Sequence, residues 1–221
     1  MKERPLLYTA PMVRATLNNT KTQTRRLRGL DRINASPNDW SHPGSIGDDH
    51  NLYARFINKD GDVVDVKCPY GKPGDQLWVR ETWQYADWTE DGYPFIKYEA
   101  DGSLVLHERI PEDWDDRLER IWVKLSEEEN YNIDKRAADR KWRPSIHHPR
   151  WASRIQLEIT NIRVERLQEC SVSDALAEGI KHNSMNYPPV EYRWLWESIN
   201  GPGSWDANPW VWVVEFRRIK P

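Results

Sequence analysis

The chain has 221 residues, of which 30% are charged, a formal net charge of −3, and 13 Trp against only 3 Phe. No segment approaches the ~20 consecutive apolar residues of a membrane helix, and no apolar signal-peptide core follows the first residues. Cys68 and Cys170 are too few for a disulfide framework. We therefore expect one cytoplasmic domain over residues 1–221, monomeric and without a membrane partner, with a core built largely from aromatic rings.

The charge is distributed unevenly along the chain. Residues 1–28 hold seven Lys and Arg against one Glu, and residues 135–154 hold seven against one Asp. A protein of net negative charge can still bind a polyanion through local basic stretches. Two solvated loops would give the same charge pattern, so composition alone leaves both interpretations open.

The first elements expected are a short helix and a hairpin. Pro11 at a first helical position predicts a helix over residues 12–17, and Asn18-Asn19 can end it because Asn tolerates the left-handed conformation. Alternating apolar residues over 52–66, interrupted by the turn pair Asp60-Gly61, predict a β-hairpin.

A strand is expected over residues 77–83, and its alternation places Glu81 and Trp83 on one apolar face. A carboxylate on such a face has a raised pKa and can serve as a general acid or base. Burial in an ion pair with Arg154 or Arg26 explains the same pattern.

The remaining elements are short strands and helices. A second hairpin is expected over 93–110, a helical period over 114–125, and a strand over 155–164 whose apolar phase shifts near Thr160-Asn161, which predicts a β-bulge. Ser171-x-x-Asp174 predicts a capping box that opens a helix ending at Gly179.

The C-terminal part predicts a helix after Pro188-Pro189, with Val190, Trp194 and Leu195 on one side, and a final strand over 210–219. We expect five Trp of these patterned segments in the core. This order of elements favours an α+β fold with a small, partly closed β-barrel and short flanking helices. The five Trp expected in the core are Trp78, Trp194, Trp196, Trp210 and Trp212.

The segment Lys21 to Arg26 offers candidates for nucleophilic catalysis. A Thr hydroxyl becomes a nucleophile when a base takes its proton, and a desolvated Lys of lowered pKa can be that base. Thr24 and Lys21 have these types, and Arg26 can hold an oxygen in its fork. In an extended segment Lys21 and Thr24 lie on opposite faces, so a bend would be needed; a helix end decorated with cations is the alternative.

Two further features are candidates. Glu178 lies in a last helical turn, where the helix dipole disfavours a carboxylate, although an ordinary exposed Glu is the simpler reading. Residues 142–151 interleave basic and aromatic side chains, as a base-stacking and phosphate-binding surface requires. We expect Arg143, His147, Arg150 and Trp151 to contact nucleic acid, and the adjacent His147-His148 does not match zinc spacing.

Taken together, several segments resemble the ASCH domain, which has a PUA-like β-barrel fold. The resemblance covers nearly the whole chain except about 30–50 and 85–140, which it implies are insertions. Two more segments, 142–154 and 196–201, are similar to the ASCH proteins common in phage and prophage genomes. The segments that resemble the ASCH domain itself are 21–26, 74–83, 174–179 and 208–216.

The resemblance implies a function for named residues. One ASCH branch consists of amidohydrolases that remove the acetyl group from N4-acetylcytidine with a Lys, a Thr and a Glu, which correspond to Lys21, Thr24 and Glu178. On this basis Thr24 is the nucleophile, Lys21 its base and Glu178 the proton shuttle. Arg26 and Glu81 would orient the base and Trp83 would stack on it, with no metal or organic cofactor.

The same resemblance leaves two rivals. Many ASCH members are regarded as non-catalytic RNA-binding modules, and some are thought to cut single-stranded RNA. The expected partner is thus a modified nucleoside or RNA in every case. An RNA-binding module would show steeply salt-dependent affinity, weakened by Arg143→Ala or Arg150→Ala but not by Thr24→Ala.

Overall fold

The computed structural model describes residues 1–48, 50–89, 93–108, 110–114, 116–117, 119–120, 123, 141–181 and 187–219. The chain divides into two compact units. Unit 1 comprises Met1–Arg4, Ala15–Leu77 and Ile155–Pro221, and unit 2 comprises Pro5–Arg14 and Trp78–Arg154. The predicted α+β class is confirmed, with mixed and antiparallel sheets.

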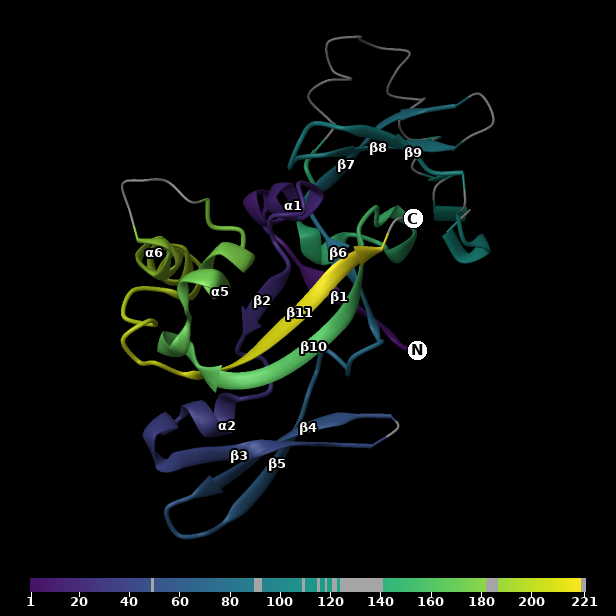
Figure 1. Ribbon diagram of the computed structural model, residues 1–221. Coiled ribbons are helices and arrows are strands. Elements are labelled where there is room, and N and C mark those ends of the chain that lie inside the picture. The colour runs from purple at the N-terminus through teal and green to yellow at the C-terminus, as the bar shows by residue number, and fades with distance from the viewer. Residues whose placement is uncertain are drawn as a thin grey trace. The chain divides into compact units, whose positions relative to one another are not determined.

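The largest sheet has five strands in the order β1-β6-β10-β11-β2 (Figure 1). Its strands are β1 (Glu3–Leu7), β2 (Gln23–Arg26), β6 (Gln76–Arg80), β10 (Gln156–Arg166) and β11 (Trp210–Ile219). The described strands form no closed barrel.

Strands β10 and β11 of unit 1 run antiparallel side by side (Figure 1). Their register shifts between Ile159 and Asn161, which confirms the predicted bulge. Four consecutive residues of β11, from Val211 to Val214, are fully buried. Because successive residues of a strand point to opposite faces, both faces of β11 are covered here. The other edge of β11 pairs antiparallel with β2, where Val214 lies opposite Thr24.

A second sheet in unit 1 has the order β3-β4-β5, built from β3 (Trp40–Gly47), β4 (Leu52–Asn58) and β5 (Val63–Lys67). The β4–β5 pair is the hairpin expected around Asp60-Gly61, and Gly61 has a φ of 87°, which an L-residue rarely adopts. A short helix, α2 (Asp31–Asn34), precedes this sheet. The residues expected as an insertion at about 30–50 thus supply α2 and β3.

Two helices of unit 1 pack on a cluster of buried apolar residues. Helix α5 (Val172–Ala177) begins at the predicted capping box, in which Ser171 and Asp174 satisfy each other's backbone N–H groups. Helix α6 (Pro188–Asn200) follows, and Figure 1 shows the two helices next to each other. The cluster comprises Leu167, Cys170, Ala175, Tyr192, Trp196, Val211 and Val213.

The predicted buried face of α6 is wrong for two of its three residues. Trp194 is 56% exposed and Val190 40%, whereas Tyr192 and Trp196 are buried in the cluster. Of the three residues predicted to be buried, only Leu195 packs against the cluster. Residues four apart form one stripe of a helix, and this helix carries two such stripes, so tertiary packing selects between them. Of the other Trp expected in the core, Trp196 and Trp212 are buried, and Trp78 and Trp210 are half-buried.

Unit 2 is built on the antiparallel sheet β7-β8-β9, from β7 (Trp83–Trp88), β8 (Pro94–Tyr98) and β9 (Leu104–Leu106). The β8–β9 pair is the second predicted hairpin. A cluster of buried residues in unit 2 comprises Trp83, Tyr85, Ile96, Tyr98 and Ala152. The single strand predicted over 77–83 is interrupted at Glu81-Thr82, because β6 and β7 pair with strands of different sheets. The burial of Glu81 and Trp83 with their apolar neighbours is nevertheless confirmed.

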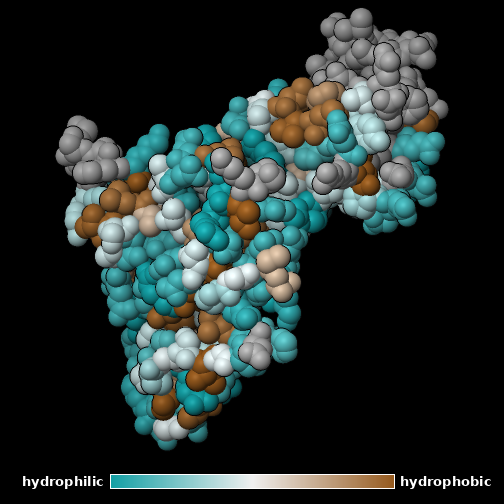
Figure 2. All heavy atoms as spheres, turned by 45° about the vertical axis from the view of Figure 1, so that its right-hand side comes forward, coloured by the Kyte–Doolittle hydropathy of each residue, from teal (hydrophilic) through white to brown (hydrophobic). Residues whose placement is uncertain are grey.

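Helix α1 (Ala10–Leu17) matches the helix predicted after Pro11, and Asn19 has the left-handed φ of 57° expected at its end. Of the helical period predicted over 114–125, residues 114, 116–117, 119–120 and 123 are described and are helical, and the other six residues lie outside the described part of the chain. No helix among the described residues is long and apolar enough to cross a membrane. The face drawn in Figure 2 is mostly hydrophilic, with hydrophobic residues in separate patches.

Candidate functional site

Lys21 and Glu178, two of the residues singled out in the sequence, contact each other inside unit 1. Lys21 Nζ donates to Glu178 Oε2 at 2.6 Å and to the Glu178 carbonyl at 3.0 Å, across 157 residues of sequence. The two residues also form an isolated antiparallel β-bridge. Both are buried, at 2% and 4% exposure.

The local backbone explains how the two segments approach. Glu178 caps the C-terminus of α5, and Gly179 follows with a φ of 93°. A Cβ on Gly179 would lie 2.8 Å from the Ala15 Cβ and 3.2 Å from the Lys21 Cβ. Only glycine therefore permits both the left-handed turn and the close contact with the end of α1 and the segment after it.

The Glu178 carboxylate has three side-chain donors. Besides Lys21, it accepts from Arg25 Nη1 at 3.3 Å and from the Tyr192 hydroxyl at 3.4 Å, both through Oε1. Burial lowers the pKa of Lys21 below its usual range, although the carboxylate of Glu178 opposes this effect. Removal from water also raises the pKa of Tyr192 well above its ordinary value, so its hydroxyl remains a donor.

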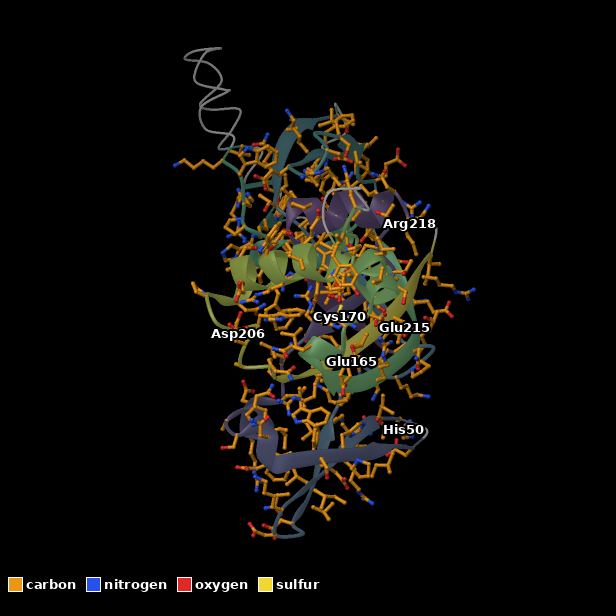
Figure 3. The ribbon with its side chains drawn as sticks, turned by 60° about the vertical axis from the view of Figure 1, so that its left-hand side comes forward. His50, Glu165, Cys170, Asp206, Glu215 and Arg218 are labelled. Carbon is orange, nitrogen blue, oxygen red and sulfur yellow. The ribbon has the colours of Figure 1, made fainter. Side chains whose placement is uncertain are left out.

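Arg25 extends this cluster toward β10. Its guanidinium donates to Glu165 Oε1, with Nη2 at 2.5 Å and Nε at 3.1 Å, and lies 3.5 Å from Asp174. Figure 3 labels Glu165 on β10 and Cys170 just ahead of α5, which flank this part of unit 1. We call Lys21, Arg25, Glu178 and Tyr192 the buried polar cluster; its net formal charge is held near neutrality by Glu165.

Thr24 and Arg26 contact each other instead. Arg26 Nε donates to Thr24 Oγ1 at 3.2 Å, and Thr24 is only 2% exposed. Gln23 contacts Asp174 and Arg25 contacts Glu165, so strand alternation directs Thr24 and Arg26 to the other face of β2. The structure thus pairs Lys21 with Glu178 and Thr24 with Arg26. Lys21 and Thr24 lie on opposite faces of the segment, as predicted for an extended conformation.

Glu81 forms the ion pair with Arg154 that was one of its two interpretations. Both Glu81 oxygens accept from Arg154, at 2.9 Å from Nε and 2.8 Å from Nη2, and Glu81 is 1% exposed. Burial raises the pKa of Glu81, while Arg154 acts in the opposite direction. Arg154 also binds Asp101 and lies 4.1 Å from the Tyr98 ring centroid, so this is a satisfied buried pair of unit 2.

The basic and aromatic residues 142–151 have separate environments in unit 2. Arg143 stacks over Trp83 and Tyr85, and His147 lines a pocket with them. Trp151 packs edge-on against Trp114 at 5.7 Å and belongs to the periphery of the core rather than to an open stacking surface.

Arg150 and His148 of the same stretch have different environments in unit 2. The Arg150 guanidinium lies 5.9 Å from the ring centroid of Trp78. His148, for which no role was predicted, is 1% exposed, and burial lowers its pKa to about 3.

Sequence reasoning missed Arg25 and Tyr192 as members of the buried polar cluster. Alternation alone placed Arg25 on the same face as Lys21, so that signal was present. Tyr192 has no comparable local signal, because its contact depends on how α6 packs. Among the described residues, no group of three or more His, Cys, Asp and Glu is arranged to hold a metal ion.

Comparison with protein-family models, with curated proteins and with solved structures found no match.

Proposed function

We propose that this protein recognises a nucleoside or RNA and is a metal-independent amidohydrolase that removes the acyl group from N4-acylated cytidine. The observation that carries the proposal is the buried contact between Lys21 and Glu178. The resemblance to the ASCH amidohydrolases requires these two residues in one site, although they are 157 positions apart in the chain. Burying a Lys and a Glu together costs free energy, because both charges are removed from water. Such a cost favours a functional reason for the contact.

In the proposed reaction, Thr24 Oγ1 attacks the acyl carbon and its proton passes to the Lys21 amine. The tetrahedral intermediate then collapses, the bond from the acyl carbon to N4 breaks, and Glu178 relays the proton to the departing amino group of cytidine. Water, deprotonated by the same base, cleaves the acyl–Thr24 ester and regenerates the enzyme. Burial supports Lys21 in this role because it lowers the pKa of the amine and so raises the fraction that is free to accept a proton, although the ion pair with Glu178 opposes this effect.

Thr24 and Lys21 project from opposite faces of this segment, so the mechanism requires the segment to bend when substrate is bound and to bring Thr24 Oγ1 within hydrogen-bond reach of Lys21 Nζ. The hydrogen bond from Arg26 to Thr24 supports a second role, because it holds a guanidinium beside the nucleophile. A fixed cation at that position can stabilise the oxyanion that develops on the acyl oxygen.

We also infer that the five-stranded sheet belongs to a partly closed PUA-like barrel. The bulge of β10 between Ile159 and Asn161, which bends and twists a strand, and the burial of both faces of β11 support this assignment. The chain would then be an ASCH protein of the type found in phages. A crystal structure in which β1 and β2 diverge as the two ends of a flat, open sheet would contradict it.

The test is incubation of the full chain with N4-acetylcytidine, followed by chromatography for cytidine and acetate. Thr24→Val keeps the shape but removes the hydroxyl, and we expect it to lower turnover at least about 100-fold. Thr22→Val is the matched control, because Thr22 is exposed two positions earlier on the same segment. No deacetylation by the wild type, or equal turnover in the two variants, would refute the hydrolase.

A further inference from the structure

Unit 2 holds a pocket of about 340 Å³ whose walls are mainly aromatic rings and arginines. Its volume lies near the lower end of the range for small-molecule sites, about 300–1,000 Å³, which suits one planar heterocycle with a polar substituent. Trp142 is 43% exposed at this pocket, whereas Trp83 is 2% exposed. The lining residues are Trp83, Tyr85, Trp114, Arg117, Trp142, Arg143, Pro144 and His147.

Two guanidinium groups are held against the aromatic walls. Arg143 lies 5.5 Å from the Trp83 ring centroid and 5.1 Å from that of Tyr85, and Arg117 lies 4.7 Å from that of Trp114. Stacking fixes the planes of these groups and leaves their N–H edges to donate. The described residues of the lining include no Asp or Glu, so the pocket favours an anion over a cation.

The position of Arg143 is fixed by the backbone as well. Arg143 N donates to the Trp83 carbonyl at 2.7 Å, and Trp83 N donates to the Arg143 carbonyl at 3.2 Å. This bridge ties the loop that carries Arg143 to strand β7. The cation is therefore part of a formed site rather than a flexible surface side chain.

Two lining residues carry N–H or O–H groups, the indole of Trp83 and the phenol of Tyr85. The buried indole nitrogen of Trp83 has no hydrogen-bond partner among the described residues. Burial raises the pKa of Tyr85 to about 12, so its phenol remains protonated at neutral pH. Aromatic rings and planar cations in one cavity are the combination that binds a nucleobase together with its phosphate.

We propose that this pocket binds a nucleotide, with the base stacked on an indole face and the phosphate on Arg143 and Arg117. The proposal does not rest on the hydrolase, because it uses none of Lys21, Thr24 and Glu178 and concerns an unmodified base. The nucleotide has two sources, a free mononucleotide or one residue of a single strand. The lining accommodates one base at a time, and both sources present the same chemistry to it.

The experiment measures binding of the full chain to two probes at low and high salt. Fluorescence anisotropy follows a labelled eight-nucleotide oligouridylate, and calorimetry follows uridine monophosphate. We expect Trp142→Ala to weaken binding about 5- to 100-fold, the effect of removing one stacking ring. Trp194→Ala is the matched control, because Trp194 is exposed on α6 of the other unit.

A second pair of variants tests the cation. Arg143→Lys keeps the charge but loses the planar stack and the fork, and we expect it to weaken binding several-fold. Arg217→Ala, an exposed arginine of β11, should leave binding unchanged. Circular dichroism melts check that each variant is folded.

The two probes separate the sources of the nucleotide. Binding of both, with the same sensitivity to Trp142→Ala, identifies a mononucleotide site, and binding of the oligonucleotide alone identifies a single-strand site. The proposal is overturned if neither probe binds, or if Trp142→Ala and Arg143→Lys bind like their controls. Failure of the deacetylation assay leaves these outcomes unaffected.

Discussion

Glu178 is the only acid among the members of the buried polar cluster, so its removal should destabilise the fold more than removal of Lys21. Glu178→Gln leaves the Lys21 ammonium beside Arg25 with no carboxylate between them, since Oε2 and Oε1 accept from the two cations separately. Removing one partner of a buried ion pair costs about 3–5 kcal/mol, because the remaining charge is left uncompensated. That range is the expected loss in the free energy of unfolding.

Lys21→Met is the matched change on the other side of the pair. It keeps the length of the side chain and leaves Glu178 with Arg25 Nη1 and the Tyr192 hydroxyl. The loss is then that of a charge-assisted hydrogen bond, about 1.5–3 kcal/mol. The difference between the two variants should be about 2 kcal/mol, with Glu178→Gln the less stable.

The assay is urea unfolding of wild type and both variants near pH 7, followed by far-ultraviolet circular dichroism. The comparison uses the shift in midpoint at constant m-value, so that the change reports native-state stability. Equal losses, a larger loss in Lys21→Met, or a loss below about 0.5 kcal/mol in Glu178→Gln would refute the reasoning, because the last is the size of an ordinary surface change.

Three further predictions concern burial. The pKa of His148 is about 3 in the folded state against 6.5 in the unfolded state, so between these pH values the unfolded chain binds more protons. The free energy of unfolding should therefore fall by about 1.4 kcal/mol per pH unit as the pH drops below 6.5. His148→Gln should lack this gradient when the urea midpoint is measured against pH. Gly179→Ala should cost about 2–4 kcal/mol through strain and overlap, measured by urea unfolding, whereas Gly203→Ala, with nothing within 4 Å, should cost clearly less; equal costs would contradict the close-contact explanation. In thermal melts, Trp196→Ala should lose about 3–5 kcal/mol and Trp194→Ala less than about 0.5; the reverse order would mean that α6 buries its other stripe.

The sequence by itself determined those features that depend on neighbours within a few residues. The turn pair Asp60-Gly61 fixed one hairpin, and the capping box of Ser171 and Asp174 fixed the start of α5. The phase shift after Ile159 located the bulge of β10. Spacing decides these features because turn dihedrals, cap hydrogen bonds and strand alternation are local.

For the candidate site, the sequence indicated types and faces but not partners. Alternation placed Lys21 and Arg25 together on one face of the segment. Its place in a last helical turn made Glu178 a candidate, and only the resemblance paired it with Lys21. The ion pair of Glu81 was foreseen only as one of two interpretations, with Arg154 as one of two possible partners.

Tertiary structure alone decided which surfaces meet. It brought Glu178 onto Lys21 across 157 residues, added Tyr192 from α6, and buried Trp196 while leaving Trp194 exposed. It also divided the strand predicted over 77–83 between two sheets. Each outcome depends on the packing of elements far apart in sequence, where several apolar stripes compete for one core and periodicity does not distinguish them.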